Sequence, residues 1–208
     1  MLSSRAVRPT CLRCLRPRAF CVCEGLGPIP SRTRVVLLQH PREARLAICS
    51  AWLTRVALEN AELHRGIRFG SDPRIAALVA EPGAALLFPG EGATPVDALA
   101  GPPPRTLVVV DGTWLQAGKM LALNPAIAAL PRLTLSGHES GYGELRREPA
   151  EGHLSTLEAV AHALGALEGD RARFAPMIDA FRRMVALQLE VSRGPRRAPR
   201  HRPPARAS

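Results

Sequence analysis

Four cysteines near the start of this 208-residue chain have a spacing that suits a metal ion. They occur as Cys11-Leu-Arg-Cys14 and Cys21-Val-Cys23, four thiols within thirteen residues. This pattern matches a closed tetrahedral zinc site, and metal binding would supply the free energy that folds so hydrophilic a stretch. The alternatives are a redox relay, an iron–sulfur cluster, or cysteines without a shared role. Because four protein ligands leave no open position, we expect the zinc to be structural.

A second group of polar residues follows a short apolar run at 107–110 and reads Asp111-Gly112-Thr113-Trp114. A carboxylate at the end of a buried strand is costly unless a partner or a substrate satisfies it. Gly112 lets the backbone approach a ligand closely, and Trp114 offers a flat face on which a base can stack. The alternative is that Asp111 or Thr113 caps the next helix while Trp114 packs in the core.

Two further polar clusters lie on either side of this one along the chain. The first is Gln39-His40-Pro41-Arg42-Glu43. A residue before proline takes extended or turn backbone, so the His40 ring can face the ends of the strands. The alternative is that Glu43 caps the following helix and His40 has no special role.

The other cluster runs from 137 to 158 and contains the single tyrosine, Tyr142. Its Arg146-Arg147 pair suits a carboxylate or a phosphate, and a helix N-terminus at Ser155-Thr156 favours an anion. The alternative is a solvated loop followed by a capped helix, since Ser155 and Glu158 form a capping-box pattern.

The elements that position these residues alternate between short apolar runs and helical patterns. The runs are apolar along their whole length, as in strands buried on both faces, so we expect an α/β fold with a mostly parallel sheet flanked by helices. Ligands in such folds bind at the carboxyl ends of the strands, where the polar clusters fall. The predicted strands are 34–39, 84–88 and 106–111, with weaker ones at 63–69 and 132–135. The predicted helices are about 43–59, 73–80, 114–123, 155–168 and 171–191.

The net charge of +10 is concentrated at the two ends of the chain. Residues 1–34 carry seven Arg and one Glu, and residues 193–208 carry six Arg and no acid, whereas the middle is slightly acidic. Cationic ends suit a polyanion such as RNA, although a basic tail can also serve solubility alone. We therefore expect a zinc-binding module over 1–33, an α/β catalytic body over 34–192, and a disordered Arg/Pro-rich tail over 193–208.

Composition also excludes several classes of protein. At 46% hydrophobic residues, the chain can bury a core and is not disordered as a whole. No apolar run approaches the roughly 20 residues that span a bilayer, and the N-terminus has no apolar signal region, so we expect a cytoplasmic protein without a membrane partner.

Taken together, the motifs resemble the DTW-domain family of tRNA-uridine aminocarboxypropyltransferases. Six pieces occur in family order over roughly 11–170. One stretch, 46–51, departs from the polar Thr/Gly-containing pattern of the family. The matching pieces are the four cysteines, Leu38–Glu43, Leu87-Phe88-Pro89, Val110–Ala117, Leu145–Pro149 and Leu154–Ala159.

The resemblance implies transfer of the 3-amino-3-carboxypropyl group of S-adenosylmethionine to N3 of a uridine in tRNA, with release of methylthioadenosine. It also implies a knotted, SPOUT-like fold, with which a dimer is compatible. Asp111 is our candidate for the base that acts on uracil N3, with Thr113 fixing the loop and Trp114 stacking on a ring. The remaining candidates fall into two groups. Those for the donor are Phe88, Pro89, Gly90, Gly112, Arg146, Arg147, Thr156 and Glu158, and those for the RNA substrate are His40, Glu43 and Tyr142.

Two other functions fit parts of the same pattern. A SPOUT-type RNA methyltransferase would need the same donor and a basic RNA-binding surface. A zinc-knuckle RNA-binding protein without catalysis would need the cysteines and the arginines but not the Asp111 and Trp114 constellation.

Overall fold

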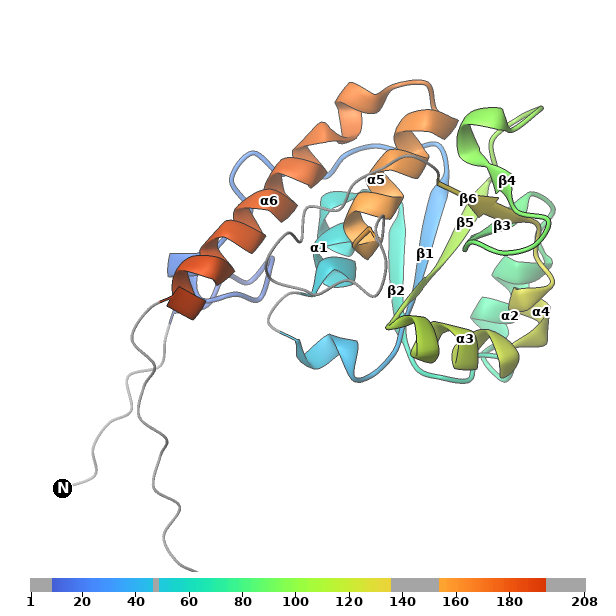
Figure 1. Cartoon of the computed structure of the whole chain (residues 1–208), viewed down its shortest axis with the longest axis horizontal. Coiled ribbons are helices and arrows are strands. Elements are labelled where there is room, and N and C mark those ends of the chain that lie inside the picture. Colours follow the sequence, from blue (N-terminus) through green and yellow to red (C-terminus); the bar gives the residue numbers. More distant parts are fainter. Residues whose placement is uncertain (1–8, 47–48, 136–153, 194–208) are drawn as a thin grey trace, which may run out of the picture.

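A computed structural model describes residues 9–46, 49–135 and 154–193 of the chain. Its centre is a sheet of six strands in the order β2-β1-β5-β3-β6-β4, and every pairing in it is parallel (Figure 1). The strands are β1 (Arg34–Gln39), β2 (Ala61–Arg65), β3 (Ala84–Leu87), β4 (Thr94–Pro95), β5 (Thr106–Asp111) and β6 (Arg132–Thr134).

Strands β1 and β5 form the middle of the sheet and are apolar because both of their faces are covered. Their six-residue register pairs Arg34 with Thr106 at one end and Gln39 with Asp111 at the other. Alternate residues serve two cores: Val35 and Leu37 contact one, whereas Val36 and Leu38 contact the other. The continuous apolar runs of the sequence are the direct result of this double burial.

The helices cover the two faces of the sheet in separate groups (Figure 1). One face packs against α1 (Ser50–Ala57), α5 (Thr156–Leu167) and α6 (Arg171–Arg193). The other face packs against α2 (Pro73–Ala80), α3 (Trp114–Ala122) and α4 (Pro125–Ala128).

This arrangement creates a topological switch between the two central strands. The helix after β1 lies on one face of the sheet, and the helix after β5 lies on the other. The loops that leave their carboxyl ends therefore diverge, and ligands bind beside such a switch point in open α/β sheets. The segments after Gln39 and Asp111 leave the sheet at this point.

The structure confirms the α/β class and the main strands and helices, and it corrects two boundaries. The helix predicted over 43–59 is a short 3-10 turn, Glu43–Arg45, followed by extended backbone at Leu46 and by α1. The strand predicted over 63–69 ends at Arg65, because the chain turns at Gly66 and Phe69 packs into the core beneath α2. Two short elements, β4 and α4, were not predicted.

Residues 9–33 pack onto the same core as α1 and α6. Val22, Leu26 and Ile29 are buried in the cluster that includes those helices. The two further 3-10 turns are Arg18–Phe20 and Val96–Ala98.

A buried acid ties the end of this segment to the corner between α5 and α6. The Glu168 carboxylate accepts from the backbone amides of Arg32 at 2.8 Å and Thr33 at 3.2 Å, and from the Arg173 guanidinium at 2.8 Å. Its side chain is completely buried.

Among the described residues, every helix is too short or too polar to cross a bilayer.

Candidate active site and metal centre

Asp111 lies at the carboxyl end of β5 and is 7% exposed. Leu107 and Val109 face α5 and α6, so the alternation of the strand turns Asp111 toward the same side. Its Oδ1 accepts a hydrogen bond from the Thr156 hydroxyl at 2.5 Å, and its Oδ2 accepts one from Gln39 Nε2 at 2.9 Å. The carboxylate is thus held in one orientation by groups from two other elements.

Gln39 has a defined amide orientation because Arg65 has donors but no acceptor. The Arg65 Nε donates to Gln39 Oε1 at 3.1 Å, so the amide nitrogen must face the opposite way, toward Asp111. The same nitrogen lies 3.3 Å from the Cys49 sulfur. A chain of hydrogen bonds therefore runs from the exposed end of β2 through a fully buried glutamine to Asp111.

His40 continues the pairing of the central strands beyond their last register position. Its backbone amide donates to the Asp111 carbonyl at 2.8 Å. Its ring Nδ1 accepts from the backbone amide of Arg42 at 3.2 Å, which leaves Nε2 as the protonated position of a neutral ring. Glu43 begins the 3-10 turn with its amide on the His40 carbonyl and does not cap α1, whose N-cap is Cys49.

The sequence left open whether Thr113 caps the next helix and whether Trp114 packs in the core. Thr113 is the N-cap of α3 in a capping box, with its hydroxyl on the Gln116 amide and the Gln116 side chain on the Thr113 amide. Trp114 is not a core residue: it is 43% exposed, and its ring lies 5.5 Å from that of Phe88 at the end of β3. The pair presents an aromatic surface near the carboxyl ends of β3 and β5.

The turn after β3 depends on glycine. Gly90 has φ +154°, and a β-carbon there would lie 2.6 Å from an Arg132 guanidinium nitrogen. Pro89 and Gly90 are exposed. At Gly112, a β-carbon would meet the Gln116 side chain at 3.1 Å, so glycine permits the tight turn into α3.

The start of α5 completes the cluster around Asp111. Ser155 and Glu158 form the predicted capping box, with the Ser155 amide donating to the Glu158 carboxylate at 2.9 Å. Glu158 is 2% exposed, and one oxygen of its carboxylate accepts this capping bond. Thr156, the first residue of the helix, is the one that reaches Asp111. Tyr142, Arg146 and Arg147 lie outside the described residues.

The four cysteines converge although they come from two separate pairs. Their sulfur atoms all lie within 4.8 Å of one another, with 4.0 Å between Cys11 and Cys23 and 3.8 Å between Cys14 and Cys21. Zinc–sulfur bonds of about 2.3 Å in a tetrahedron place the sulfurs about 3.8 Å apart. The donor set therefore fits a tetrahedral metal site. Cys49 lies outside the cluster.

The electrostatics within the cluster are uneven. Backbone hydrogen bonds from Cys14 and Arg13 lower the pKa of the Cys11 thiol to about 6. Burial, together with the hydrogen bond and charge of Cys14, raises the pKa of Cys23. Metal binding has to displace the proton from such a raised thiol, and this displacement couples affinity to pH.

Gln39 belongs to the polar motif at residues 39–43, but the sequence predicted no role for it. It predicted no role for Arg65 either. The one available signal was the period of β1, which places Gln39 on the same face as Val35 and Leu37. The residue that Gln39 contacts, Asp111, follows only from the pairing of β1 with β5 in the folded protein.

Comparison with known proteins gives one family and several relatives. The DTW domain model matches residues 8–189. The tRNA-uridine aminocarboxypropyltransferase 2 of Drosophila melanogaster is 35% identical over 77% of this chain and 67% of its own length. Its namesake in Macaca fascicularis is 29% identical over 88% and 64%, and tRNA-uridine aminocarboxypropyltransferase A of Arabidopsis thaliana is 29% identical over 87% and 81%. The chain thus spans about two thirds of those animal relatives. No solved structure matches it significantly.

Proposed function

This chain belongs to the DTW-domain family, and from that premise we propose that it is a tRNA-modifying transferase. It moves the 3-amino-3-carboxypropyl group of S-adenosylmethionine to N3 of a tRNA uridine. The bond between the sulfonium and the γ-carbon breaks, a bond between that carbon and N3 forms, and the N3 proton leaves. Methylthioadenosine is the second product. The observation that carries the proposal is the buried Asp111 carboxylate, fixed at the switch point beside an exposed tryptophan.

Asp111 accepts the proton of uracil N3. This nitrogen is weakly acidic, so attack requires a base or a donor network close to it. Gln39 and Thr156 each donate to a different carboxylate oxygen, and these two bonds hold the carboxylate in one orientation at the end of β5. Trp114 stacks on the base or on the adenine, and His40 and Glu43 contact the RNA.

The sulfonium of the donor makes three carbons electrophilic, and choosing one of them is a problem of positioning. The donor lies along the turn after β3 and the start of α5, at Phe88, Pro89, Gly90, Gly112 and Thr156. Two observations support this assignment. Pro89 and Gly90 in that turn are exposed, and the Phe88 ring contacts the Trp114 ring near the ends of the strands. Arg146 or Arg147 binds the methionyl carboxylate or a phosphate of tRNA, and Tyr142 contacts the RNA.

The cysteines hold a structural zinc ion, which supplies folding free energy to residues 11–23 and takes no part in the reaction. The arginines of this segment, among them Arg13, Arg16 and Arg18, then form a basic surface for RNA phosphates. The proposal includes a SPOUT-like knot and a location in the cytoplasm.

The experiment is nucleoside mass analysis of unmodified tRNA incubated with the protein and S-adenosylmethionine. Aminocarboxypropyl-uridine should appear together with an equal amount of methylthioadenosine. A methylated nucleoside would instead indicate an RNA methyltransferase. Bound tRNA without a new nucleoside would overturn the proposed transfer.

A further inference from the structure

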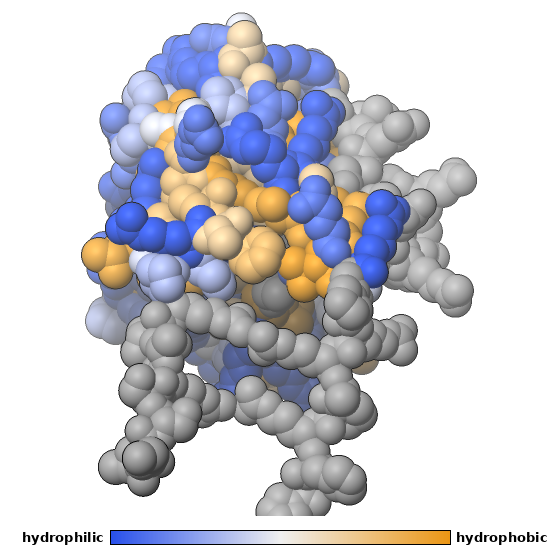
Figure 2. Space-filling model, turned by 90° about the vertical axis from the view of Figure 1, so that its left-hand side faces the viewer, coloured by the Kyte–Doolittle hydropathy of each residue, from blue (hydrophilic) through white to orange (hydrophobic). Residues whose placement is uncertain are grey.

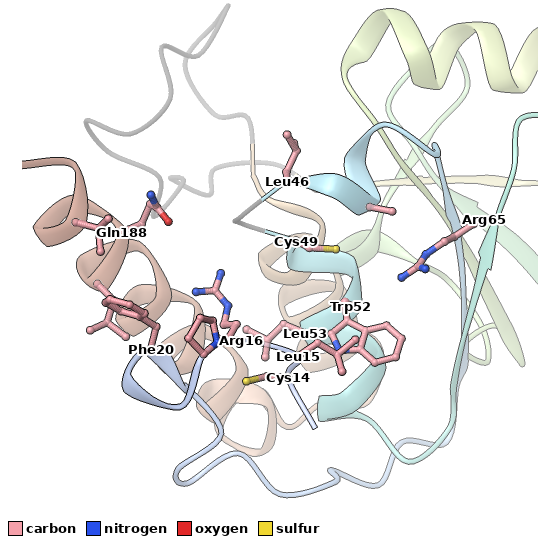
Figure 3. A pocket seen from close by; sticks show the side chains of 14 residues that line it. Cys14, Leu15, Arg16, Phe20, Leu46, Cys49, Trp52, Leu53, Arg65 and Gln188 are labelled. Carbon is pink, nitrogen blue, oxygen red and sulfur yellow. The ribbon is translucent and has the colours of Figure 1, made fainter. Parts of the chain in front are cut away.

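A pocket of about 350 Å³ lies between the cysteine segment (residues 11–23) and helices α1 and α6 (Figure 3). Phe20 and Leu15 line it from the cysteine segment, Trp52 from α1, and Leu187 from α6. The described surface on this side of the molecule carries a group of hydrophobic side chains bordered by hydrophilic ones (Figure 2). The site described above uses none of these residues.

The charged groups of the pocket are cationic. Arg16 and Arg65 lie on opposite sides of it, and none of its lining residues is acidic (Figure 3). The Arg65 guanidinium also lies over the Trp52 ring, 5.8 Å from its centre. Aromatic and aliphatic walls with two guanidinium groups suit a planar base carrying a phosphate. The same charges disfavour S-adenosylmethionine, whose sulfonium and ammonium groups would find no carboxylate there.

The pocket adjoins the Asp111 site through two of its own lining residues. Arg65 donates to Gln39 Oε1, and Cys49 accepts from Gln39 Nε2, the nitrogen that also donates to Asp111. A group bound against Arg65 is thus separated from the carboxylate by two side chains, those of Arg65 and Gln39. A volume near the lower end of the range for ligand sites, about 300–1,000 Å³, admits one nucleotide rather than a helix of RNA.

The cysteine cluster forms the wall of the pocket that is nearest to the candidate metal site. Cys14 lines the pocket and is also one of the four convergent thiols. The next residue, Leu15, has a φ of +58°, a strained value for a branched side chain, and its amide is held by the Cys11 carbonyl at 2.9 Å. On the other side, the Trp52 indole donates to the Arg13 carbonyl at 3.1 Å. The cluster and α1 therefore fix the width of the opening.

We propose that this pocket receives one unstacked nucleotide of the RNA substrate, next to the nucleotide that reacts at Asp111. Its base contacts the apolar wall of Phe20, Leu53 and Trp52 on the Arg65 side, and its phosphate binds Arg16 on the opposite side. The inference rests on the proposed function for the identity of the RNA, but binding is tested separately from transfer.

The test uses the fact that the chain has two tryptophans, Trp52 and Trp114. In a Trp114→Phe protein, fluorescence reports on Trp52 alone. An unmodified tRNA transcript should quench this signal, whereas a blunt-ended, fully paired RNA duplex of equal charge should leave it largely unchanged because it has no unpaired loop. A response to S-adenosylmethionine alone, or equal quenching by the paired duplex, would overturn the proposal.

Two arginines of the same segment provide a matched comparison of affinity. Arg16→Gln removes a charge from the pocket, and Arg18→Gln removes an equal charge from an exposed position outside it. We expect tRNA affinity to fall about tenfold for Arg16→Gln and about twofold for Arg18→Gln. Equal losses would mean that the arginines act through charge alone and would overturn the proposal.

A blocking variant covers the case in which Arg16→Gln fails to fold. Gln188→Phe fills the pocket from α6, and Glu190→Phe places the same ring on the exposed side of that helix. Weaker tRNA binding in the first variant alone supports the proposal, and equal binding in both contradicts it. Transfer is measured on the protein that retains Trp114. Product there without quenching of Trp52 in the Trp114→Phe protein refutes the pocket but not the activity, and the reverse result refutes the activity but not the pocket.

Discussion

The side-chain amide of Gln39 donates to the carboxylate of Asp111 over 2.9 Å, and the two residues are direct partners in the register of β1 and β5. Parallel strands place register partners on the same face, so this contact follows from the pairing itself. Arg65 on the adjacent strand β2 then decides which end of the amide faces Asp111. Three neighbouring strands thus orient the proposed base.

The first prediction concerns the charge of Asp111. Asp111→Asn should lower kcat by about 10²–10⁴, the usual contribution of a positioned base. The fold should persist, because the Asn oxygen can accept from Gln39 while the Thr156 hydroxyl rotates to accept from the new amide. Product formation, metal content and tRNA affinity should be measured together. Wild-type turnover in the variant would remove Asp111 from the role of base.

The second prediction treats Gln39 as a positioning residue. Gln39→Leu removes the hydrogen bonds to Asp111 and to Arg65. The bond to the Asp111 carboxylate is worth about 1.5–3 kcal/mol, so kcat should fall about tenfold to a hundredfold. The acid limb of the pH–rate profile should move to higher pH, because the ionised carboxylate loses a donor.

Thr54→Val is the matched control for this change. Thr54 is also fully buried, but its hydroxyl bonds to the Ser50 carbonyl within α1, away from Asp111. It should lower stability without moving the pH profile. The same profile shift in both variants would show that the effect is structural.

The third prediction concerns the metal. Cys14→Ser should lose the bound ion and unfold at a lower temperature, because Cys14 is both a candidate ligand and a member of the core. Cys49→Ser should keep one metal ion per chain, since Cys49 is not part of the cluster. Elemental analysis and thermal unfolding provide the measurement. Full metal content in Cys14→Ser would be incompatible with a four-cysteine site.

The fourth prediction addresses stability at the corner between α5 and α6. Glu168→Gln leaves at least one of the three donors around this buried carboxylate poorly satisfied, which should reduce the free energy of unfolding by about 2–3 kcal/mol. Urea denaturation measures the change. Glu190→Gln, at an exposed position on α6, should change stability by less than about 0.5 kcal/mol. Equal changes in the two variants would contradict the importance of this network.

The fifth prediction follows from Asp170, which precedes α6. Hydrogen bonds from the Arg173 backbone amide and guanidinium hold the pKa of Asp170 below its usual range. A lowered pKa contributes stability above the unfolded value of about 3.9, and this contribution is lost as the pH falls through the folded value. Asp170→Asn should therefore flatten the acid limb of a stability–pH curve measured by urea denaturation. An unchanged limb would mean that the interaction contributes nothing to folding.

Local chemistry in the sequence determined much of the fold. Apolar runs of four to six residues marked β1, β3 and β5, because strands buried on both faces need no polar positions. The capping pattern of Ser155 and Glu158 located the start of α5, and the cysteine spacing located the candidate metal site. Each of these signals is carried by residues close together in the chain.

Only the tertiary structure decided which distant residues meet. Gln39, Arg65, Asp111 and Thr156 come from four elements, and their contacts depend on the strand order and on the face that each helix covers. The exposure of Trp114 and the pocket beside α6 likewise depend on packing between segments far apart in sequence. Periodicity reveals that a residue faces a core, but it carries no information about what lies across that core.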